Sequence, residues 1–319
     1  MQKSEYALRT KEPKNARDAD QVEMQAILSG FAVVDDASRD DLVSGELDDN
    51  AVMAADANGR EAFHEKDLAE DALVGGALTA IRLRVSHLGP LYPFRLEKAK
   101  LTYEPSVTGF YEFCLALSLQ TDISTSPFNL LPQLFERVVA ALVRWHYPNS
   151  SSVLHTGFPR KPSSKFKKGL SPLSKNRGEW VWGPEAHQDP DPELTVVKDE
   201  TLDFVVTASA LDPRAGRLYL LGQCACGDNW SDKLGEPNLA KIAKWFKPAW
   251  ISPPLRVFTT PYLLGDVTML ETCRDFGGLV LDRIRLSQIA ETQVPAVFGT
   301  RLRRRIKKTV KTALQLDLP

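Results

Sequence analysis

Apolar and polar residues follow two different periodicities along the 319-residue chain, and each predicts its own kind of element. Residues 94–103 alternate between apolar and polar side chains, as an edge strand does. The part before residue 120 is otherwise mostly helical in pattern. Apolar residues recur at helical intervals in segments that predict helices over 18–28, 60–72, 108–120 and 128–147.

The strongest β pattern is a hairpin in the second half of the chain. Thr201–Ala210 is apolar and β-branched, residues 212–216 (DPRAG) have turn chemistry, and residues 217–226 return as a second strand. The apolar positions of this hairpin are nearly continuous, so we expect both of its faces to be covered, as in the middle of an α/β sheet. Strands expected at 255–260 and 278–282 alternate with helices expected at 239–246, at 267–273 and from residue 283 on.

These patterns predict an α/β fold divided into three regions. Residues 1–107 form an acidic, mostly helical N-terminal addition, and residues 108–292 form a core with a mixed central sheet flanked by helices. Residues 293–319 form a basic C-terminal helix that begins after Pro295. Within the core, residues 150–177 are basic and rich in Pro and Ser, so we expect a connector there.

The charge distribution adds a feature that the net charge of −1 hides. Residues 1–75 carry 18 acidic and 8 basic residues, a net charge of −10, which leaves +9 for the rest of the chain. Four bases of the terminal helix lie three or four residues apart and share one face, which suits contacts to phosphates; the alternative is a face that is solvated or that pairs with the acidic region. The bases of this face are Arg301, Arg304, Arg305 and Lys308.

The rest of the composition excludes several classes of protein. A content of 43% hydrophobic and 25% charged residues is ordinary for a folded chain and excludes disordered, collagen-like and coiled-coil classes. Four scattered cysteines are too few for a disulfide scaffold, and Cys224 and Cys226 lack the second pair that a zinc site needs. No apolar stretch approaches the roughly 18 residues that span a bilayer, and no signal peptide is evident. We therefore expect a cytoplasmic protein with no membrane partner.

Three polar side chains stand alone on apolar elements. Glu136 is the one acid of the 128–147 helix, Asp203 is the one acid of the first hairpin strand, and Gln223 lies near the end of the second. A buried carboxylate needs a cation, a metal or several hydrogen-bond donors. Oxygen ligands from two adjacent strands make a site for Mg²⁺ or Mn²⁺ plausible, because carboxylate and amide oxygens suit a hard cation.

The order of these residues resembles the PD-(D/E)xK restriction-endonuclease-like nuclease superfamily, and most closely its Mrr-like branch. The resemblance covers roughly residues 128–235: Phe135-Glu136 on a helix, Leu202-Asp203 on a strand, and LLGQCA at 220–225 on the next strand. It implies a restriction-endonuclease-like core. It also implies that Asp203 binds the metal directly, that Gln223 replaces the usual second acid, and that Glu136 supports the metal and its waters.

One position departs from the pattern of that superfamily. Ala225 stands where the superfamily places a catalytic lysine. Lys233, eight residues further on, is the best candidate for a displaced lysine that would stabilise negative charge in the transition state. If no lysine replaces it, catalysis is lost.

The resemblance implies a Mg²⁺-dependent endonuclease that hydrolyses DNA phosphodiester bonds. Such a hydrolase resembles effectors of restriction or antiviral (antiphage) defence, which act with an ATPase or sensor subunit or as homo-oligomers. The alternative is a catalytically inactive subunit of the same fold that binds DNA or serves as a scaffold in a larger defence complex, and Ala225 is its main support. A protein-interaction role for residues 1–75 is compatible with both.

Each candidate also has an ordinary structural explanation. Glu136 and Lys233 could be solvated surface residues, Asp203 a salt-bridged acid, and Gln223 a partner of the backbone. Arg160, in the string HTGFPR at 155–160, could contact phosphate or belong to a structured turn. Asp199 and Glu200 could assist Asp203 or lie at the surface. No phosphate-binding loop or nucleophile elbow is present in the sequence.

Overall fold

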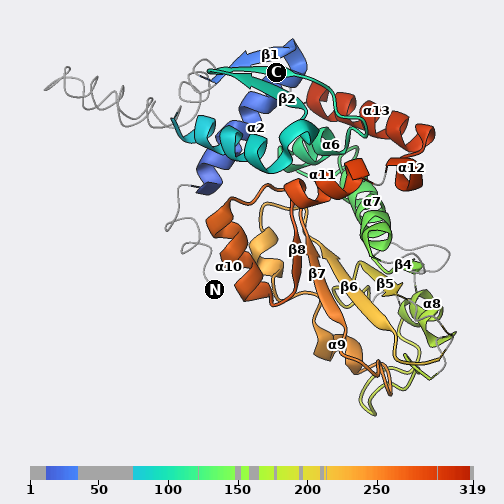
Figure 1. Ribbon diagram of the computed structural model, residues 1–319. Coiled ribbons are helices and arrows are strands. Elements are labelled where there is room, and N and C mark those ends of the chain that lie inside the picture. Colours follow the sequence, from blue (N-terminus) through green and yellow to red (C-terminus); the bar gives the residue numbers. More distant parts are fainter. Residues whose placement is uncertain are drawn as a thin grey trace, which may run out of the picture. The chain divides into compact units, whose positions relative to one another are not determined.

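The computed structural model describes most of the chain and divides it into two compact units (Figure 1). One unit comprises Met1–Gln120, Leu263–Thr268 and Arg303–Pro319, and the other comprises Thr121–Tyr262 and Met269–Leu302. This grouping places 108–120 with the N-terminal part of the chain, whereas the sequence-based division assigns that segment to the core. The residues described are 12–34, 75–120, 122–147, 152–157, 165–175, 178–193, 197–208, 212, 214–292 and 294–316.

The first unit contains a small antiparallel sheet and several helices. Its three strands lie in the order β1-β3-β2. A helix over residues 75–88 carries Arg84, whose side chain is fully buried. The elements of this unit are α2 (Glu12–Ser29), β1 (Phe31–Val33), the 3-10 helix η1 (Gly89–Leu91), β2 (Phe94–Glu97), β3 (Lys100–Tyr103) and α6 (Phe110–Ser118).

The single edge strand expected over residues 94–103 is wrong, because the segment is a hairpin. β2 pairs antiparallel with β3, and Lys98 adopts a φ of 57° where the chain reverses. The apolar alternation continues through this turn, and the turn contains neither Gly nor Pro, so the pattern shows no break. The helix expected over 60–72 lies outside the described residues.

The second unit is built on one five-stranded mixed sheet in the order β4-β5-β6-β7-β8, and Figure 1 shows the strands side by side in this order. β4, β5 and β6 form an antiparallel meander, whereas β6, β7 and β8 run parallel. The strands are β4 (Ser152–His155), β5 (Phe204–Ala208), β6 (Leu218–Cys224), β7 (Leu255–Thr259) and β8 (Leu279–Leu281).

Helices flank this sheet, which confirms the predicted mixed α/β class. The helix α9 lies in the connection between the parallel strands β6 and β7, as a parallel crossover requires. The helical elements are α7 (Leu130–His146), α8 (Phe166–Leu170), η2 (Leu173–Lys175), η3 (Trp230–Lys233), α9 (Leu239–Ala243), α11 (Arg283–Thr292) and α12 (Val294–Val297). Two further helices carry residues of both units: α10 (Asp266–Phe276) and α13 (Thr300–Leu316).

The predicted hairpin and its neighbouring helix hold the core of the second unit. Every residue of β5 except Ala208 and every residue of β6 except Leu218 is buried, so the expectation that both faces are covered is confirmed. α7 packs on β4, β5 and β6. Its buried face matches the predicted apolar stripe: Leu131, Leu134, Phe135, Val138, Val139, Leu142 and Val143.

One glycine in the hairpin is required by packing. A Cβ at Gly222 would lie 2.0 Å from the ring of Phe204, which is backbone-paired with it across the β5–β6 ladder. The core of the unit also contains an aromatic cluster in which the indoles of Trp182 and Trp245 stack at 5.5 Å. Asp203 directly precedes Phe204, the first residue of β5.

The connector expected over 150–177 contains regular structure that the pattern did not reveal. β4 and α8 both lie in it. Ser152 and His155 are exposed, so this edge strand lacks the continuous apolar run that identifies β5 and β6. Among the described residues, no helix is both long and apolar enough to cross a membrane.

Candidate active site

Two carboxylates of the second unit border one small space. Glu136 lies on α7, and Asp203 immediately precedes β5. A Cβ built at Gly157, just after β4, would lie 3.0 Å from Glu136 Oε2 and 3.2 Å from Asp203 Oδ1. Because glycine has no Cβ, this point between the two oxygens is left open. The structure therefore brings together two of the residues that the sequence singled out.

Asp203 is held by backbone from the strands on both sides. Its carbonyl oxygen accepts the N–H groups of Thr156 (2.8 Å) and Gly157 (3.0 Å), and its carboxylate Oδ2 accepts the N–H of Cys224 (2.7 Å). Its own N–H donates to the carbonyl of Gly222 (2.9 Å), although Gly222 pairs with the next residue, Phe204, in the ladder. The ladder is thus irregular at Asp203, which is a common way to redirect a side chain at a strand end.

Burial and a neighbouring like charge disfavour the ionisation of both carboxylates. Burial raises the pKa of Asp203 well above its usual value, and the nearby Glu136 charge raises it further, against the opposing Cys224 hydrogen bond. Burial also raises the pKa of Glu136 to about 7, and Asp199 adds to this shift, whereas Arg137 and Lys233 oppose it. Neither carboxylate has an ion-pair partner within 4 Å among the described residues. Both carboxyls are therefore held toward their protonated forms, and a cation bound beside them would favour their ionisation.

Lys233 lies close to this pair. It ends η3, and its positive charge lowers the pKa of both Glu136 and Asp203 against the larger effect of burial. Lys233 and Asp199 also act in opposite directions on the pKa of Glu236, which burial raises. The lysine that the sequence proposed as displaced thus belongs to the electrostatic surroundings of the two carboxylates.

Gln223 lies on β6. Its side chain is buried, and its Oε1 atom has no hydrogen-bond partner among the described residues. It directly precedes Cys224, whose N–H binds Asp203. Ala225, at the position where the resemblance would place a lysine, is completely buried. A buried amide oxygen without a partner is costly, so a ligand at this oxygen would be stabilising.

These residues fit a hard divalent cation. They offer two carboxylates and one amide oxygen, which are ligands that Mg²⁺ and Mn²⁺ accept together with water. A cation would relieve the repulsion between Glu136 and Asp203, and the missing side chain of Gly157 leaves room beside both. Within the described ranges no group of three His, Cys, Asp or Glu residues is arranged to hold a metal ion, so such a site would depend on Gln223 and water.

Four of the five predicted nucleic-acid-binding residues lie within the described part of the chain. Arg160 lies outside the described residues. The four predicted bases of the terminal helix are on α13, and all four are exposed: Arg301, Arg304, Arg305 and Lys308. The opposite side of α13 is buried through Ile306, Val310, Ala313 and Leu314, so the basic face is the solvent face of an amphipathic helix.

Sequence reasoning missed several residues at the site. Gly157 was part of the string HTGFPR, but nothing in that string showed that β4 ends beside Asp203. Asp199 was considered only as a possible assistant, and Glu236 and Arg137 were not considered. A signal for Arg137 was present, because it directly follows Glu136.

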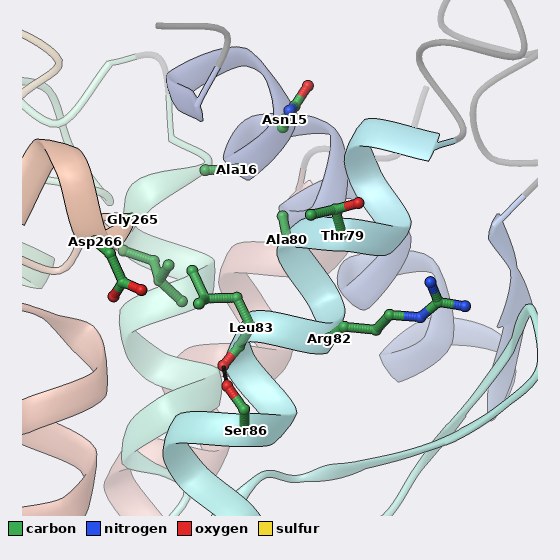
Figure 2. Close-up of a pocket in the computed structure, with 10 residues that line it drawn as sticks. Asn15, Ala16, Thr79, Ala80, Arg82, Leu83, Ser86, Gly265 and Asp266 are labelled. Carbon is green, nitrogen blue, oxygen red and sulfur yellow. Dashed lines mark hydrogen bonds between the residues drawn. The ribbon is translucent and has the colours of Figure 1, made fainter.

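A pocket of about 440 Å³ in the first unit does not have the arrangement of a catalytic site. Figure 2 shows that its polar side chains do not converge, since Arg82 points away from Asp266 and Asn15 points elsewhere. The hydroxyl of Ser86 donates to the backbone carbonyl of Leu83 within the same helix. The Ser86 hydroxyl at this pocket therefore serves local structure.

Comparisons with protein-family models, with curated proteins and with solved structures found no match for this chain.

Proposed function

We propose that this protein is a metal-dependent endonuclease that hydrolyses DNA phosphodiester bonds. The observation that carries the proposal is the cluster of the second unit, in which Glu136 and Asp203 border an open point and Lys233 acts electrostatically on both. Paired carboxylates with a nearby lysine are suited to binding a divalent cation and to stabilising negative charge on a phosphate.

The fold supports the proposal. The chain runs from α7, which carries Glu136, to the Asp203 strand end and then to the Gln223 strand. This order, in a mixed sheet flanked by helices, is what the resemblance to the PD-(D/E)xK superfamily implies for a restriction-endonuclease-like core. The biological setting proposed with it is restriction or antiphage defence, in the cytoplasm, with an ATPase or sensor subunit or a second copy of the chain as partner.

In this mechanism Asp203 and Gln223 would hold Mg²⁺ or Mn²⁺, and Glu136 would bind it or its waters. When bound, the cation would neutralise charge on the phosphodiester and lower the pKa of water. The backbone N–H of Cys224 fixes the orientation of the Asp203 carboxylate through its bond to Oδ2. The ammonium of Lys233 stabilises the negative charge that develops on the phosphate as the P–O bond breaks.

A second candidate function is a catalytically inactive subunit of the same fold that binds DNA or acts as a scaffold. The observation that favours it is Ala225, which is fully buried where the resemblance places the catalytic lysine. In that case the carboxylate pair would be a remnant, and Lys233 would balance its charge without contributing to chemistry.

Cleavage of supercoiled plasmid by the full-length protein, with Mg²⁺, with Mn²⁺ and with EDTA, tests the proposal. We expect cleavage that requires a divalent cation and that falls by about 10²–10³-fold in Asp203→Asn, because that substitution removes the charge of the direct ligand. Asp275→Asn, at an exposed position of α10, is the matched control and should cleave as the unmodified protein does.

Two results would count against the proposal. Metal-dependent cleavage that persists unchanged in Asp203→Asn would contradict the site assignment. Absence of cleavage with either cation, alone and with candidate partner proteins, would favour the inactive subunit.

A further inference from the structure

An arginine next to the carboxylate pair has no structural partner among the described residues. Arg137 follows Glu136 on α7, and successive helix residues point about 100° apart, so Glu136 points inward while Arg137 is exposed. Its charge lowers the pKa of Glu136 and of His155. Within the described part of the chain, Arg137 makes no hydrogen bond and no ion pair within 4 Å.

A histidine lies on β4, a strand that packs against α7. His155 ends β4, two residues before Gly157, and its side chain is exposed. Partial loss of hydration and the positive charge of Arg137 lower the pKa of His155. A neutral imidazole can donate one N–H to a phosphate oxygen. No hydrogen bond to the His155 ring is formed within the described residues.

The position of the positively charged Arg137 beside Glu136 needs an explanation. A guanidinium that served only to neutralise Glu136 would be expected to form an ion pair with it, and Arg137 does not. An exposed guanidinium with its donors directed to solvent can instead bind an anion that arrives with the substrate. The anion of a nucleic acid backbone is a phosphate, and a guanidinium binds two phosphate oxygens at once.

We infer that Arg137 and His155 form a phosphate-binding site for the DNA backbone at the rim of the carboxylate pair. Arg137 binds a phosphate oxygen pair and His155 donates a second contact, which places a neighbouring phosphodiester over Glu136 and Asp203. This inference rests on the proposed function and extends it by naming substrate-binding residues that the resemblance did not indicate.

DNA binding by the full-length protein, measured with Ca²⁺ in place of Mg²⁺, tests the site. We expect Arg137→Gln to raise the Kd about tenfold and to reduce the slope of log Kd against log salt by about 0.9, as loss of one phosphate contact does. Arg137→Lys keeps the charge, so the slope should persist while the loss of the bidentate contact raises the Kd less. His155→Ala should raise the Kd about threefold.

Arg274→Gln, which removes the same charge from an exposed position of α10, is the control and should change neither quantity. If the protein cleaves DNA and Arg137→Gln binds as Arg274→Gln does, the phosphate site is overturned and the nuclease proposal stands. If the protein binds with the expected dependence on Arg137 but never cleaves, the phosphate site stands and the nuclease proposal fails. If it does not bind DNA at all, both are overturned.

Discussion

Each of the two compact units contains a pair of neighbouring carboxylates, and the two pairs have opposite surroundings. In the first unit Asp20 and Glu23 lie 2.8 Å and 2.7 Å from the guanidinium of Arg84, which is completely buried. The hydroxyls of Tyr92 and Tyr111 also donate to Glu23. This pair is neutralised by the chain itself.

In the second unit Glu136 and Asp203 have no such partner. Burial raises the pKa of both, the charge of Glu136 adds to the shift of Asp203, and Lys233 opposes these effects only from outside ion-pair distance. The difference shows how two similar sets of residues are assigned different roles. Acids that are paired within the chain stabilise the fold, whereas acids left short of positive charge are suited to a cation that comes from solution.

The largest expected effect is a loss of stability when the acids of the first unit lose their arginine. Arg84→Met should lower the free energy of unfolding by about 3–5 kcal/mol, because it leaves Asp20 and Glu23 buried without a cation. Urea unfolding measures this change, and Arg82→Met on the exposed side of the same helix serves as the control. If Arg84→Met lowers the free energy of unfolding no more than Arg82→Met does, Arg84 does not neutralise Asp20 and Glu23, and the two carboxylate pairs do not differ in this way.

A smaller effect is expected from filling the space beside the unpaired acids. The methyl group of Gly157→Ala would stand 3.0 Å from Glu136 Oε2 and 3.2 Å from Asp203 Oδ1, where we expect the cation. Cleavage should fall about tenfold or more and need a higher Mg²⁺ concentration, while stability changes by less than about 1 kcal/mol. A titration of plasmid cleavage against Mg²⁺ concentration measures this.

Gly235→Ala is the matched control for that substitution. A Cβ at Gly235 has no atom within 4 Å, so cleavage should not change. Equal cation requirements for Gly157→Ala and Gly235→Ala would show that the space beside the carboxylates holds no cation.

The smallest expected effect concerns the pH dependence of stability. Folding raises the pKa of Glu136 from about 4.5 to about 7, so protonation of this carboxyl stabilises the folded state. This contribution is complete below about pH 4.5 and is lost as the pH rises through about 7. Without divalent cations, Glu136→Gln should therefore be more stable than the unmodified protein at pH 8 by about 1–2 kcal/mol, since partial exposure screens the effect.

Urea unfolding at pH 5 and pH 8 measures that difference. Mg²⁺ should restore much of the stability of the unmodified protein at pH 8, because it binds only the folded state, and should do less for Glu136→Gln. The same loss of stability between pH 5 and pH 8 in both proteins would show that Glu136 ionises without penalty and does not share the site of Asp203.

Sequence patterns predicted the elements whose burial follows a regular period. The apolar stripe of α7 and the continuous apolar runs of β5 and β6 were visible because one face of a helix, or both faces of a central strand, must be apolar. β4 was missed because an edge strand with exposed ends has no such requirement. The turn at Lys98 was missed because it lacks the usual turn residues.

For the candidate site, residue type along the chain identified Glu136, Asp203 and Gln223, since isolated polar side chains on apolar elements need partners. Lys233 was named only because a lysine was missing at Ala225. What the sequence could not supply was the neighbours from other elements, namely Gly157 from the end of β4 and Asp199 and Glu236 from loops.

The sequence by itself determined which segments are apolar enough to be buried and which polar residues stand alone within them. Only the tertiary structure decided that Asp20 and Glu23 meet Arg84, whereas Glu136 and Asp203 meet each other beside Gly157. The physical reason is that burial follows from local composition, whereas neutralisation of a charge depends on contacts between residues far apart in the chain. Glu23 meets an opposite charge on Arg84, 61 positions away in the sequence. Asp203 meets a like charge on Glu136, 67 positions away.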